Sequence, residues 1–363
     1  MKKNIIIFMP SIEGGGVEKN LILVSNYLST KIKNVILITI SKRFKQKFNK
    51  TIKIKTLKSD IWDKQSRRFK YFLAILLLIK ELIKKEKKLV FAFQANIYCI
   101  ILCKIFGVKI IVRSNSAPVG WSQNLIKKKI FKFFLKKADL VMVNSLDFQN
   151  DLQKEFNVDA KCIYNPLNKK EILIKSKRKS RKFFKTKKLK ILNVGRFTEQ
   201  KDQLTLLKSL KLIKNTIKFE AIIVGRGILK NQLLNYINKN NLNDCIKLVD
   251  FLENPFPIIK QSELFILTSR YEGLPNVLLE SLALNKFIIS SNCRTGPKEI
   301  LSNGKGGILF KVGDYKSLAK NIIFYNKNRN SCKKKLNFAK KNLDRFDYKE
   351  NLNKYLEMVK EYM

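Results

Sequence analysis

The sequence predicts an α/β protein with two doubly wound, Rossmann-like domains, each built on a parallel sheet. Two observations lead to this fold class. Short apolar segments that suit buried strands alternate with helical patterns through both halves of the 363 residues, as in parallel sheets with crossover helices. A polar, strongly basic stretch separates the halves at residues 169–188, and this chain length gives each of two domains its own core. We expect the two domains to face each other across a cleft.

The expected strands follow in chain order. In the first domain, residues 1–168, they are IIIFMP, VILITI, LVFAF, KIIVR and LVMVNS. In the second domain, residues 189–345, they are KILNVG, EAIIVG, IKLVDF, LFILTS, FIISS and GILF. Ligands of doubly wound sheets bind beyond the carboxyl ends of the strands, so the residues that directly follow these segments are the first candidates for a site.

The composition is strongly basic, with a formal net charge of +47. The excess is larger in the N-terminal half, which favours an anionic partner such as a membrane surface or a nucleic acid. No apolar run reaches the ~20 residues that span a bilayer, and the first apolar run is short for a signal peptide. The six cysteines form no zinc pattern and histidine is absent, so we expect reduced thiols in a cytoplasmic protein.

The segment 268–301 has the strongest functional pattern. An apolar strand precedes Glu272, and NVLLESLALN is typical of a helix with Pro275 in its first turn and Glu280 inside it. Free backbone N–H groups at such a helix start favour a phosphate, and the two carboxylates suit hydroxyl groups. A nucleotide sugar carries both kinds of group. The residues of this candidate site are Glu272, Gly273, Leu274, Pro275, Asn276, Val277 and Glu280.

Five motifs occur in a recognisable order. They are EGGGVEK at 13–19, YNPL at 164–167, NVGRFTEQKD at 193–202, VGRG at 224–227 and the segment just described. In their order and spacing the chain resembles the retaining glycosyltransferases of family 4, glycosyl transferases group 1, which have the GT-B fold. The resemblance implies an N-terminal domain that binds the acceptor and a C-terminal domain that binds the nucleotide-sugar donor. It also implies that the last helix, within 346–363, crosses back to the first domain.

Two cations are expected beside the donor diphosphate. Arg196 is expected to end the first strand of the second domain, and Lys201 is expected to begin the following helix. Fixed cations there neutralise the charge that builds up as the sugar–phosphate bond breaks. The resemblance implies that Arg196 and Lys201 hold the phosphates, that Glu280 binds the ribose hydroxyls, and that Glu272 contacts the donor sugar. Arg196, Lys201 and Glu272 are therefore the candidate catalytic residues.

Further candidates lie in loops after other strands. Consecutive glycines let backbone amides approach a ligand closely, so Gly15 and Gly16 can touch the donor diphosphate or the acceptor, although a tight turn explains them equally simply. Gly225 makes a turn near the nucleotide or serves the fold alone. Phe251 and Leu252 match the place where the family holds the base by backbone contacts.

The absence of histidine separates this chain from several members of the family. It excludes a histidine general base and fits a front-face substitution in which the leaving phosphate takes the acceptor's proton. Arg113, Ser114 and Asn115 follow a strand and are candidates for contact with the sugar or the acceptor. No Asp-x-Asp motif occurs, so we expect no metal and no cofactor besides the substrate, a UDP- or GDP-linked sugar.

One basic segment, residues 121–140, mixes aromatic side chains with lysines. It contains Trp121, Phe131, Phe133 and Phe134 together with Lys127, Lys128, Lys129, Lys132, Lys136 and Lys137. Such a helix can lie on an anionic membrane, each lysine near the surface contributing about 1 kcal/mol. The alternative is an amphipathic helix packed on the core with a solvated basic face.

The expected function is therefore retaining, metal-independent transfer of a sugar to a glycan acceptor, such as a polyprenyl-linked precursor of lipopolysaccharide, capsule or glycoprotein glycans. We expect a cytoplasmic protein that is peripheral on the inner face of the cytoplasmic membrane. A nucleic-acid-binding protein is an alternative that the charge invites, but no binding motif supports it. A second alternative is a GT-B relative with different chemistry, such as a nucleotide-sugar epimerase.

Overall fold

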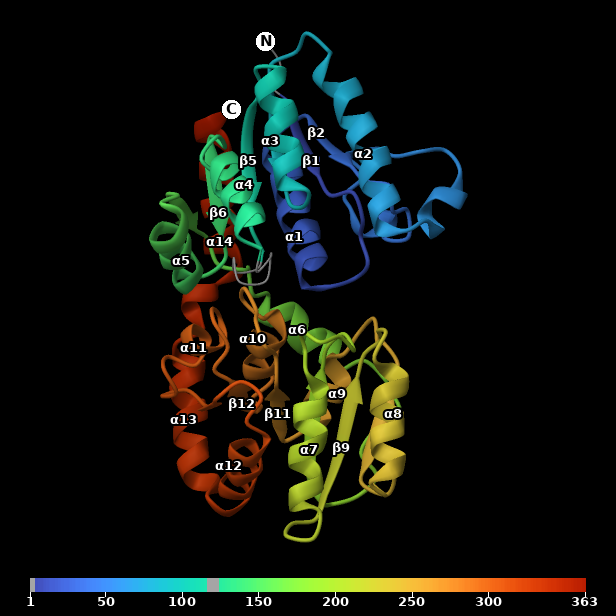
Figure 1. The fold of residues 1–363 in the computed structure, drawn as a ribbon, viewed down its shortest axis with the longest axis vertical. Coiled ribbons are helices and arrows are strands. Elements are labelled where there is room, and N and C mark those ends of the chain that lie inside the picture. Colours follow the sequence, from blue (N-terminus) through green and yellow to red (C-terminus); the bar gives the residue numbers. More distant parts are fainter. Residues whose placement is uncertain (1–3, 116–123) are drawn as a thin grey trace. The chain divides into compact units, whose positions relative to one another are not determined.

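The computed structural model describes residues 4–115 and 124–363 and divides the chain into two compact units (Figure 1). Unit 1 comprises Met1–Pro166 and Tyr348–Met363, and unit 2 comprises Leu167–Asp347. Each unit contains a fully parallel sheet with helices on its faces. The predicted class, two doubly wound α/β domains, is confirmed.

The sheet of unit 1 has seven strands among the described residues, in the order β3-β2-β1-β4-β5-β6-β7. The strands are β1 (Asn4–Phe8), β2 (Val35–Ile38), β3 (Lys53–Lys55), β4 (Lys88–Ala92), β5 (Lys109–Arg113), β6 (Leu140–Val143) and β7 (Ala160–Cys162). The central strands are continuous apolar runs because helices cover both faces of the sheet. In β1, Ile5 and Ile7 face one core, whereas Ile6 and Phe8 face the other.

Helices cover the two faces of this sheet unequally. The first core contains side chains of α1 (Gly16–Lys31) and α14 (Tyr348–Tyr362), which pack against each other. The second core contains side chains of α2 (Arg67–Leu82), α3 (Asn96–Ile105), α4 (Leu125–Leu135) and α5 (Leu146–Phe156). Short 3-10 helices η1 (Lys45–Lys47) and η2 (Asp60–Lys64) lie between β2 and α2. Unit 1 is thus completed by the last helix of the chain.

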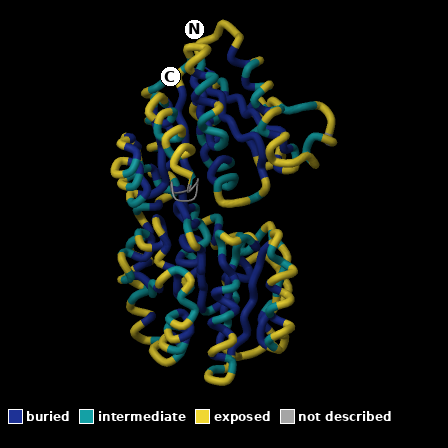
Figure 2. The backbone as a smooth tube through the Cα atoms, viewed as in Figure 1, coloured by how far each residue is buried: buried dark blue, intermediate teal, exposed yellow. Residues whose placement is uncertain are grey.

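Unit 2 contains a six-stranded sheet in the order β10-β9-β8-β11-β12-β13. Its strands are β8 (Leu189–Val194), β9 (Phe219–Val224), β10 (Ile246–Val249), β11 (Leu264–Leu267), β12 (Phe287–Ser291) and β13 (Ile308–Phe310). Its helices are α6 (Lys169–Ser176), α7 (Gln203–Ile213), α8 (Lys230–Lys239), α9 (Phe256–Gln261), α10 (Asn276–Ala283), α11 (Pro297–Ile300), α12 (Tyr315–Lys327), α13 (Arg329–Lys341) and the 3-10 helix η4 (Asp344–Phe346). Figure 2 shows that the central strands of both units are buried and that exposure is concentrated in loops and outer helix faces.

The expected linker, residues 169–188, is part of unit 2 instead. Its first half forms α6, which packs against α9 and α10. Asn168 caps this helix by accepting a hydrogen bond from the backbone N–H of Glu171 at 3.0 Å. The sequence did not predict this helix, because its composition is basic and only a few of its side chains, such as Ile172, are buried.

Candidate active site

The central feature of unit 2 is an ion pair between Lys201 and Glu272, from the loops after β8 and β11. The side chains are 16% and 8% exposed, respectively. Because β8 and β11 are neighbours where the strand order reverses, their carboxyl ends form the switch point at which such sheets bind ligands. The structure therefore brings two of the three predicted catalytic residues together at the expected edge of the sheet.

Hydroxyl groups surround Glu272. The Ser269 hydroxyl donates to its Oε1 at 2.6 Å, and the Thr295 hydroxyl donates to its backbone oxygen at 2.6 Å. Ser291, at the end of β12, donates to the backbone oxygen of Ser269 at 2.6 Å. We did not predict these hydroxyl residues, although serine and threonine at the ends of apolar strands were a signal. Together they fix the orientation of the carboxylate before any ligand binds.

Backbone-directed hydrogen bonds also tie the two loops to each other. The Thr268 hydroxyl donates to the backbone oxygen of Lys201 at 2.9 Å, and the Gln200 amide donates to the backbone oxygen of Tyr271 at 3.0 Å. The N–H of Arg270 donates to the backbone oxygen of Gln200 at 2.8 Å. The position of the ion pair is therefore built into the loop geometry. Lys201 precedes α7 by two residues, where we had expected it to begin that helix.

Arg196 lies two residues beyond β8 and is exposed. Its guanidinium is 3.4 Å from Oε1 of Gln200, and its backbone oxygen accepts from the Gln203 amide at 3.0 Å. The backbone is thus held while the charged group stays accessible to solvent. An accessible arginine of this kind can bind an anion such as a phosphate.

The helix after Glu272 begins slightly later than expected. Pro275 is the N-cap of α10 rather than part of its first turn. Glu280 lies inside α10 and is buried, as are Gly273 and Leu274. Asn276 and Val277, which begin the helix, are half-buried.

Two of the glycines permit close approach of neighbouring loops. A Cβ at Gly225 would lie 1.9 Å from the backbone oxygen of Gly195, and a Cβ at Gly296 would lie 2.2 Å from that of Gly273. A side chain at either position would push the loops of the site apart. Gly225 is accounted for by this packing between the loops after β8 and β9.

Phe251 and Leu252 follow β10 and are half-buried. The guanidinium of Arg226 lies over the Phe251 ring, 4.6 Å from its centroid. Arg226 comes from the VGRG motif, which we had interpreted only through its glycines. The loops after β9 and β10 are therefore in contact through a cation–π pair.

In unit 1, Arg113 does not occupy the predicted position for contact with a sugar or an acceptor. Its side chain is fully buried. Its Nε donates to the Tyr355 hydroxyl at 2.8 Å, its Nη2 donates to Oδ1 of Asn165 at 2.6 Å, and its Nη1 pairs with Asn115. This prediction was wrong, because Arg113 instead attaches α14 to the sheet. Ser114 is also buried, and the Asn115 amide donates to the backbone oxygen of Phe93 at 2.9 Å.

The glycine loop of unit 1 forms the start of α1. Gly15 is the N-cap and Gly16 the first helical residue. Glu18 folds back on this loop, since a Cβ at Gly15 would lie 2.7 Å from its Oε2. An acid in the first turn stabilises a helix start, so part of the role of Glu18 is structural.

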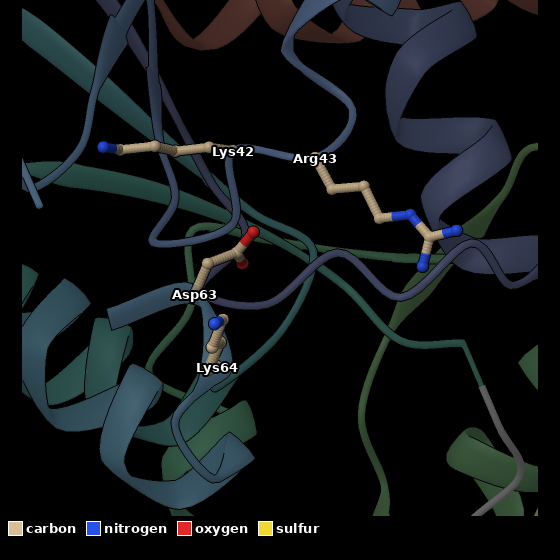
Figure 3. A pocket seen from close by; sticks show the side chains of 4 residues that line it. All are labelled: Lys42, Arg43, Asp63 and Lys64. Carbon is tan, nitrogen blue, oxygen red and sulfur yellow. The ribbon is translucent and has the colours of Figure 1, made fainter. Parts of the chain in front are cut away.

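A pocket of about 350 Å³ in unit 1 is lined by Lys42, Arg43, Asp63 and Lys64 (Figure 3). Asp63 also pairs with Lys70 on α2 at 3.4 Å. Figure 3 shows that the side chains of Lys42 and Arg43 extend in opposite directions. The pocket is therefore a basic hollow whose cations do not converge on one point.

Helix α4 exposes much of its apolar surface. Ile126 and Phe133 are 69% and 58% exposed, whereas Leu135 is buried and Phe134 packs against the core. The neighbouring helix α3 exposes Ile105. Of the aromatic residues named for the basic segment, Trp121 lies outside the described residues. The helix is thus anchored by its C-terminal end and leaves an apolar and basic surface open.

Comparison with known proteins agrees with this architecture. Residues 175–342, nearly all of unit 2, match the family model "Glycosyl transferases group 1". The crystal structure of Anabaena Alr3699/HepE in complex with UDP-glucose superposes with a TM-score of 0.77 at 17% identity, covering 99% of both chains. The fold is GT-B. It is the fold that the motifs had suggested.

Two curated relatives extend the match. An uncharacterized glycosyltransferase of Methanocaldococcus jannaschii is 35% identical over 220 residues, which cover 56% of this chain and 53% of that protein. The chain therefore aligns with about half the length of this relative. A Campylobacter jejuni N-acetylgalactosamine-N,N'-diacetylbacillosaminyl-diphospho-undecaprenol 4-alpha-N-acetylgalactosaminyltransferase is 28% identical over 284 residues, covering 75% of this chain and 76% of that protein. Both relatives carry the name of a glycosyltransferase.

In the described parts of the chain, no helix is long and apolar enough to cross a membrane. Nor do three or more cysteine, aspartate or glutamate side chains gather there in a way that could hold a metal ion.

Proposed function

We propose that the protein is a retaining family 4 glycosyltransferase that moves a sugar from a UDP- or GDP-sugar to a lipid-linked glycan. The products would be cell-surface polysaccharides, lipopolysaccharides or glycoprotein glycans. The observation that carries this proposal is the Lys201–Glu272 pair at the switch point of unit 2, with the exposed Arg196 on the same loop as Lys201. It supplies cations for a diphosphate and a carboxylate for sugar hydroxyls within one set of tied loops.

Arg196 and Lys201 act on the diphosphate. Negative charge grows on the leaving phosphate as the sugar–phosphate bond breaks, and cations held in place beforehand stabilise it without reorganisation. Lys201 and Ser269 both donate to Oε1 of Glu272, so this carboxylate holds Lys201 in position. The other carboxylate oxygen of Glu272 accepts a hydroxyl of the donor sugar, and Glu280 on α10 accepts the ribose hydroxyls. These roles let the chain work without a metal ion.

Retention follows from substitution on the face that the leaving group occupies. The bond between the anomeric carbon and the phosphate oxygen breaks, and the acceptor oxygen bonds to the same face of that carbon. The acceptor's proton passes to an oxygen of the leaving nucleotide diphosphate, a role that needs no protein base. The whole chain contains no histidine that could act as one.

The acceptor is proposed to be lipid-linked and the protein to be peripheral on an anionic membrane. The name of the Campylobacter relative describes a polyprenyl diphosphate acceptor. In this chain, α4 exposes Ile126 and Phe133 next to several lysines of the same helix. Apolar side chains enter the interface while lysines pair with anionic headgroups, which is the pattern of a surface-bound helix.

The test is a panel of UDP-, GDP- and ADP-sugars with membrane lipid extract as acceptor, following release of the nucleotide diphosphate. Wild-type protein is compared with Glu272→Gln, which keeps the shape of the side chain, and with Lys211→Ala, an exposed lysine of α7, as control. We expect lipid-dependent release from one donor, lost in the glutamine variant and kept in the control. NMR of the product should show the anomeric configuration of the donor. Absence of release and of nucleotide binding in the wild type would refute the proposal.

A further inference from the structure

The turn after β12 contains a strained residue in contact with the loop of Glu272. Thr295 has a backbone φ of 64°, in the left-handed region, and it is buried. Branching at Cβ makes this conformation an outlier for threonine, because Cβ approaches the carbonyl oxygen that follows it. Among the non-glycine residues with positive φ in the described parts of the chain, only Thr295 is β-branched. The surroundings of the turn must therefore maintain this conformation.

Contacts between two loops hold the turn in place. The Thr295 hydroxyl donates to the backbone oxygen of Glu272 at 2.6 Å. The residue before it, Arg294, forms an isolated parallel bridge with Tyr271. The loop after β12 thus lies against the loop after β11 at two consecutive positions, both next to the carboxylate of the ion pair.

A third contact follows directly. Gly296 has a φ of 85° and approaches the other loop so closely that an added Cβ would lie 2.2 Å from the backbone oxygen of Gly273. Residues 294–296 are therefore in register with residues 271–273. This register leaves little room for the turn to relax toward an unstrained backbone.

The hydrogen bond from Thr295 also determines the direction of a neighbouring N–H group. A trans peptide is planar, and its C=O and N–H groups point in opposite directions. Because the carbonyl of Glu272 accepts from Thr295, the N–H of Gly273 points away from the turn. A fixed N–H suits a phosphate oxygen, and the carboxylate beside it suits a hydroxyl group.

The fold by itself does not require threonine at this position. Glycine takes a positive φ without steric cost, as the next residue, Gly296, does. Threonine adds a hydroxyl, and its branched Cβ limits the rotation of that hydroxyl about χ1. The strain at Thr295 is therefore tied to a rigid hydrogen bond with the backbone of Glu272.

We propose that Thr295 is a positioning residue for sugar transfer, which fixes the peptide between Glu272 and Gly273 at the cost of backbone strain. The inference rests on the proposed function and goes beyond it, because it gives a role to a residue that acts only through another loop. Activity then depends on the hydroxyl, whereas stability depends on how well the residue tolerates a positive φ. The two properties separate when this one position is changed.

The test compares four variants of the full chain. Thr295→Ser keeps the hydroxyl, and Thr295→Val keeps the branched shape without it. Thr295→Ala and Thr295→Gly lack both groups and differ in their tolerance of a positive φ. Thr186→Val is the matched control, since this hydroxyl donates to Glu220 at 3.1 Å near the amino end of β9, away from the strand ends that carry the site.

Three quantities are measured on each protein. They are kcat/KM for donor-dependent sugar transfer, the midpoint of thermal unfolding, and the amide NMR signal of Gly273 in ¹⁵N-labelled protein without substrate. We expect kcat/KM about tenfold lower in the valine, alanine and glycine variants, as the loss of one hydrogen bond predicts. The serine variant and the control should stay near the wild type.

The other two quantities test the cause. The Gly273 signal should shift in Thr295→Val and stay in place in Thr295→Ser. Thr295→Gly should unfold at a higher temperature than Thr295→Ala, the reverse of the order in an ordinary helix or strand.

The assignment is overturned if Thr295→Val keeps the kcat/KM of the wild type, or if Thr295→Ser loses as much as Thr295→Val. It is also overturned if kcat/KM follows the unfolding midpoint through the series, or if no variant moves the Gly273 signal. A wild type that transfers no sugar from any donor would instead refute the proposed function.

Discussion

Units 1 and 2 arrange their first strands in the same way, yet the loops at their switch points carry different chemistry. β8 and β11 correspond in order to β1 and β4. In unit 2 these loops pair Lys201 with Glu272 and carry the exposed Arg196, whereas in unit 1 they carry Glu13 and Gln94. The difference teaches that the sheet order fixes where a ligand binds, and the loop residues fix which ligand it is. Cations suit a diphosphate, and oxygen acceptors suit hydroxyls.

The largest expected effect comes from Lys201→Met. Loss of this cation should lower kcat/KM about 10²–10³-fold, as removal of one preorganised electrostatic group does. Glu272 would also be left buried without its partner, which costs about 3–5 kcal/mol of unfolding free energy. Steady-state kinetics and urea unfolding check the two effects separately. Near-normal activity would show that the switch point of unit 2 is not the donor site.

A double variant separates the two roles of the ion pair. Lys201→Met with Glu272→Gln removes both charges, so we expect it to recover most of the stability lost in Lys201→Met, about 2–4 kcal/mol. Activity should remain as low as in the single variant because the cation is still missing. Recovery of activity along with stability would mean that the pair serves only the fold.

The variant Arg113→Leu tests whether the arginine at a strand end of unit 1 serves the fold rather than ligand binding. This arginine lies at a strand end, as Arg196 nearly does, but it is buried among Tyr355, Asn165 and Asn115. Its removal should cost about 2–3 kcal/mol by leaving buried polar groups unpaired and loosening α14. The thermal midpoint should fall while UDP or GDP binding stays unchanged. Weaker nucleotide binding at full stability would restore Arg113 to a functional role.

The smallest effect concerns the surface of α4. Phe133→Ser should weaken binding to phosphatidylglycerol vesicles about tenfold, since a buried aromatic side chain contributes about 1.5–3 kcal/mol in an apolar environment. Phe338→Ser, an exposed phenylalanine of α13 in unit 2, is the matched control. Sedimentation with vesicles measures both. Equal binding of the two variants would place the membrane contact elsewhere or remove it.

Several site features could be predicted from the sequence because they depend on local pattern. Glu272 and Lys201 were found in motifs next to apolar strands, and the structure places them at adjacent strand ends. Their pairing with each other could not be predicted, since it joins loops 71 residues apart. Arg113 was misassigned for the same reason, because its partner Tyr355 is distant in the chain. A position directly after an apolar strand does not tell whether the side chain points into solvent or into the core.

The sequence by itself determined the two α/β domains, most of their strands and the motif residues at the strand ends of unit 2. These features depend on local patterns, namely the periodicity of apolar residues, the positions of glycine and proline, and the helix caps. Only the tertiary structure decided that Lys201 is held by Glu272, that Arg113 anchors α14, and that Thr295 contacts the backbone of Glu272. Those contacts join distant segments, and their geometry depends on how the helices pack on the sheet.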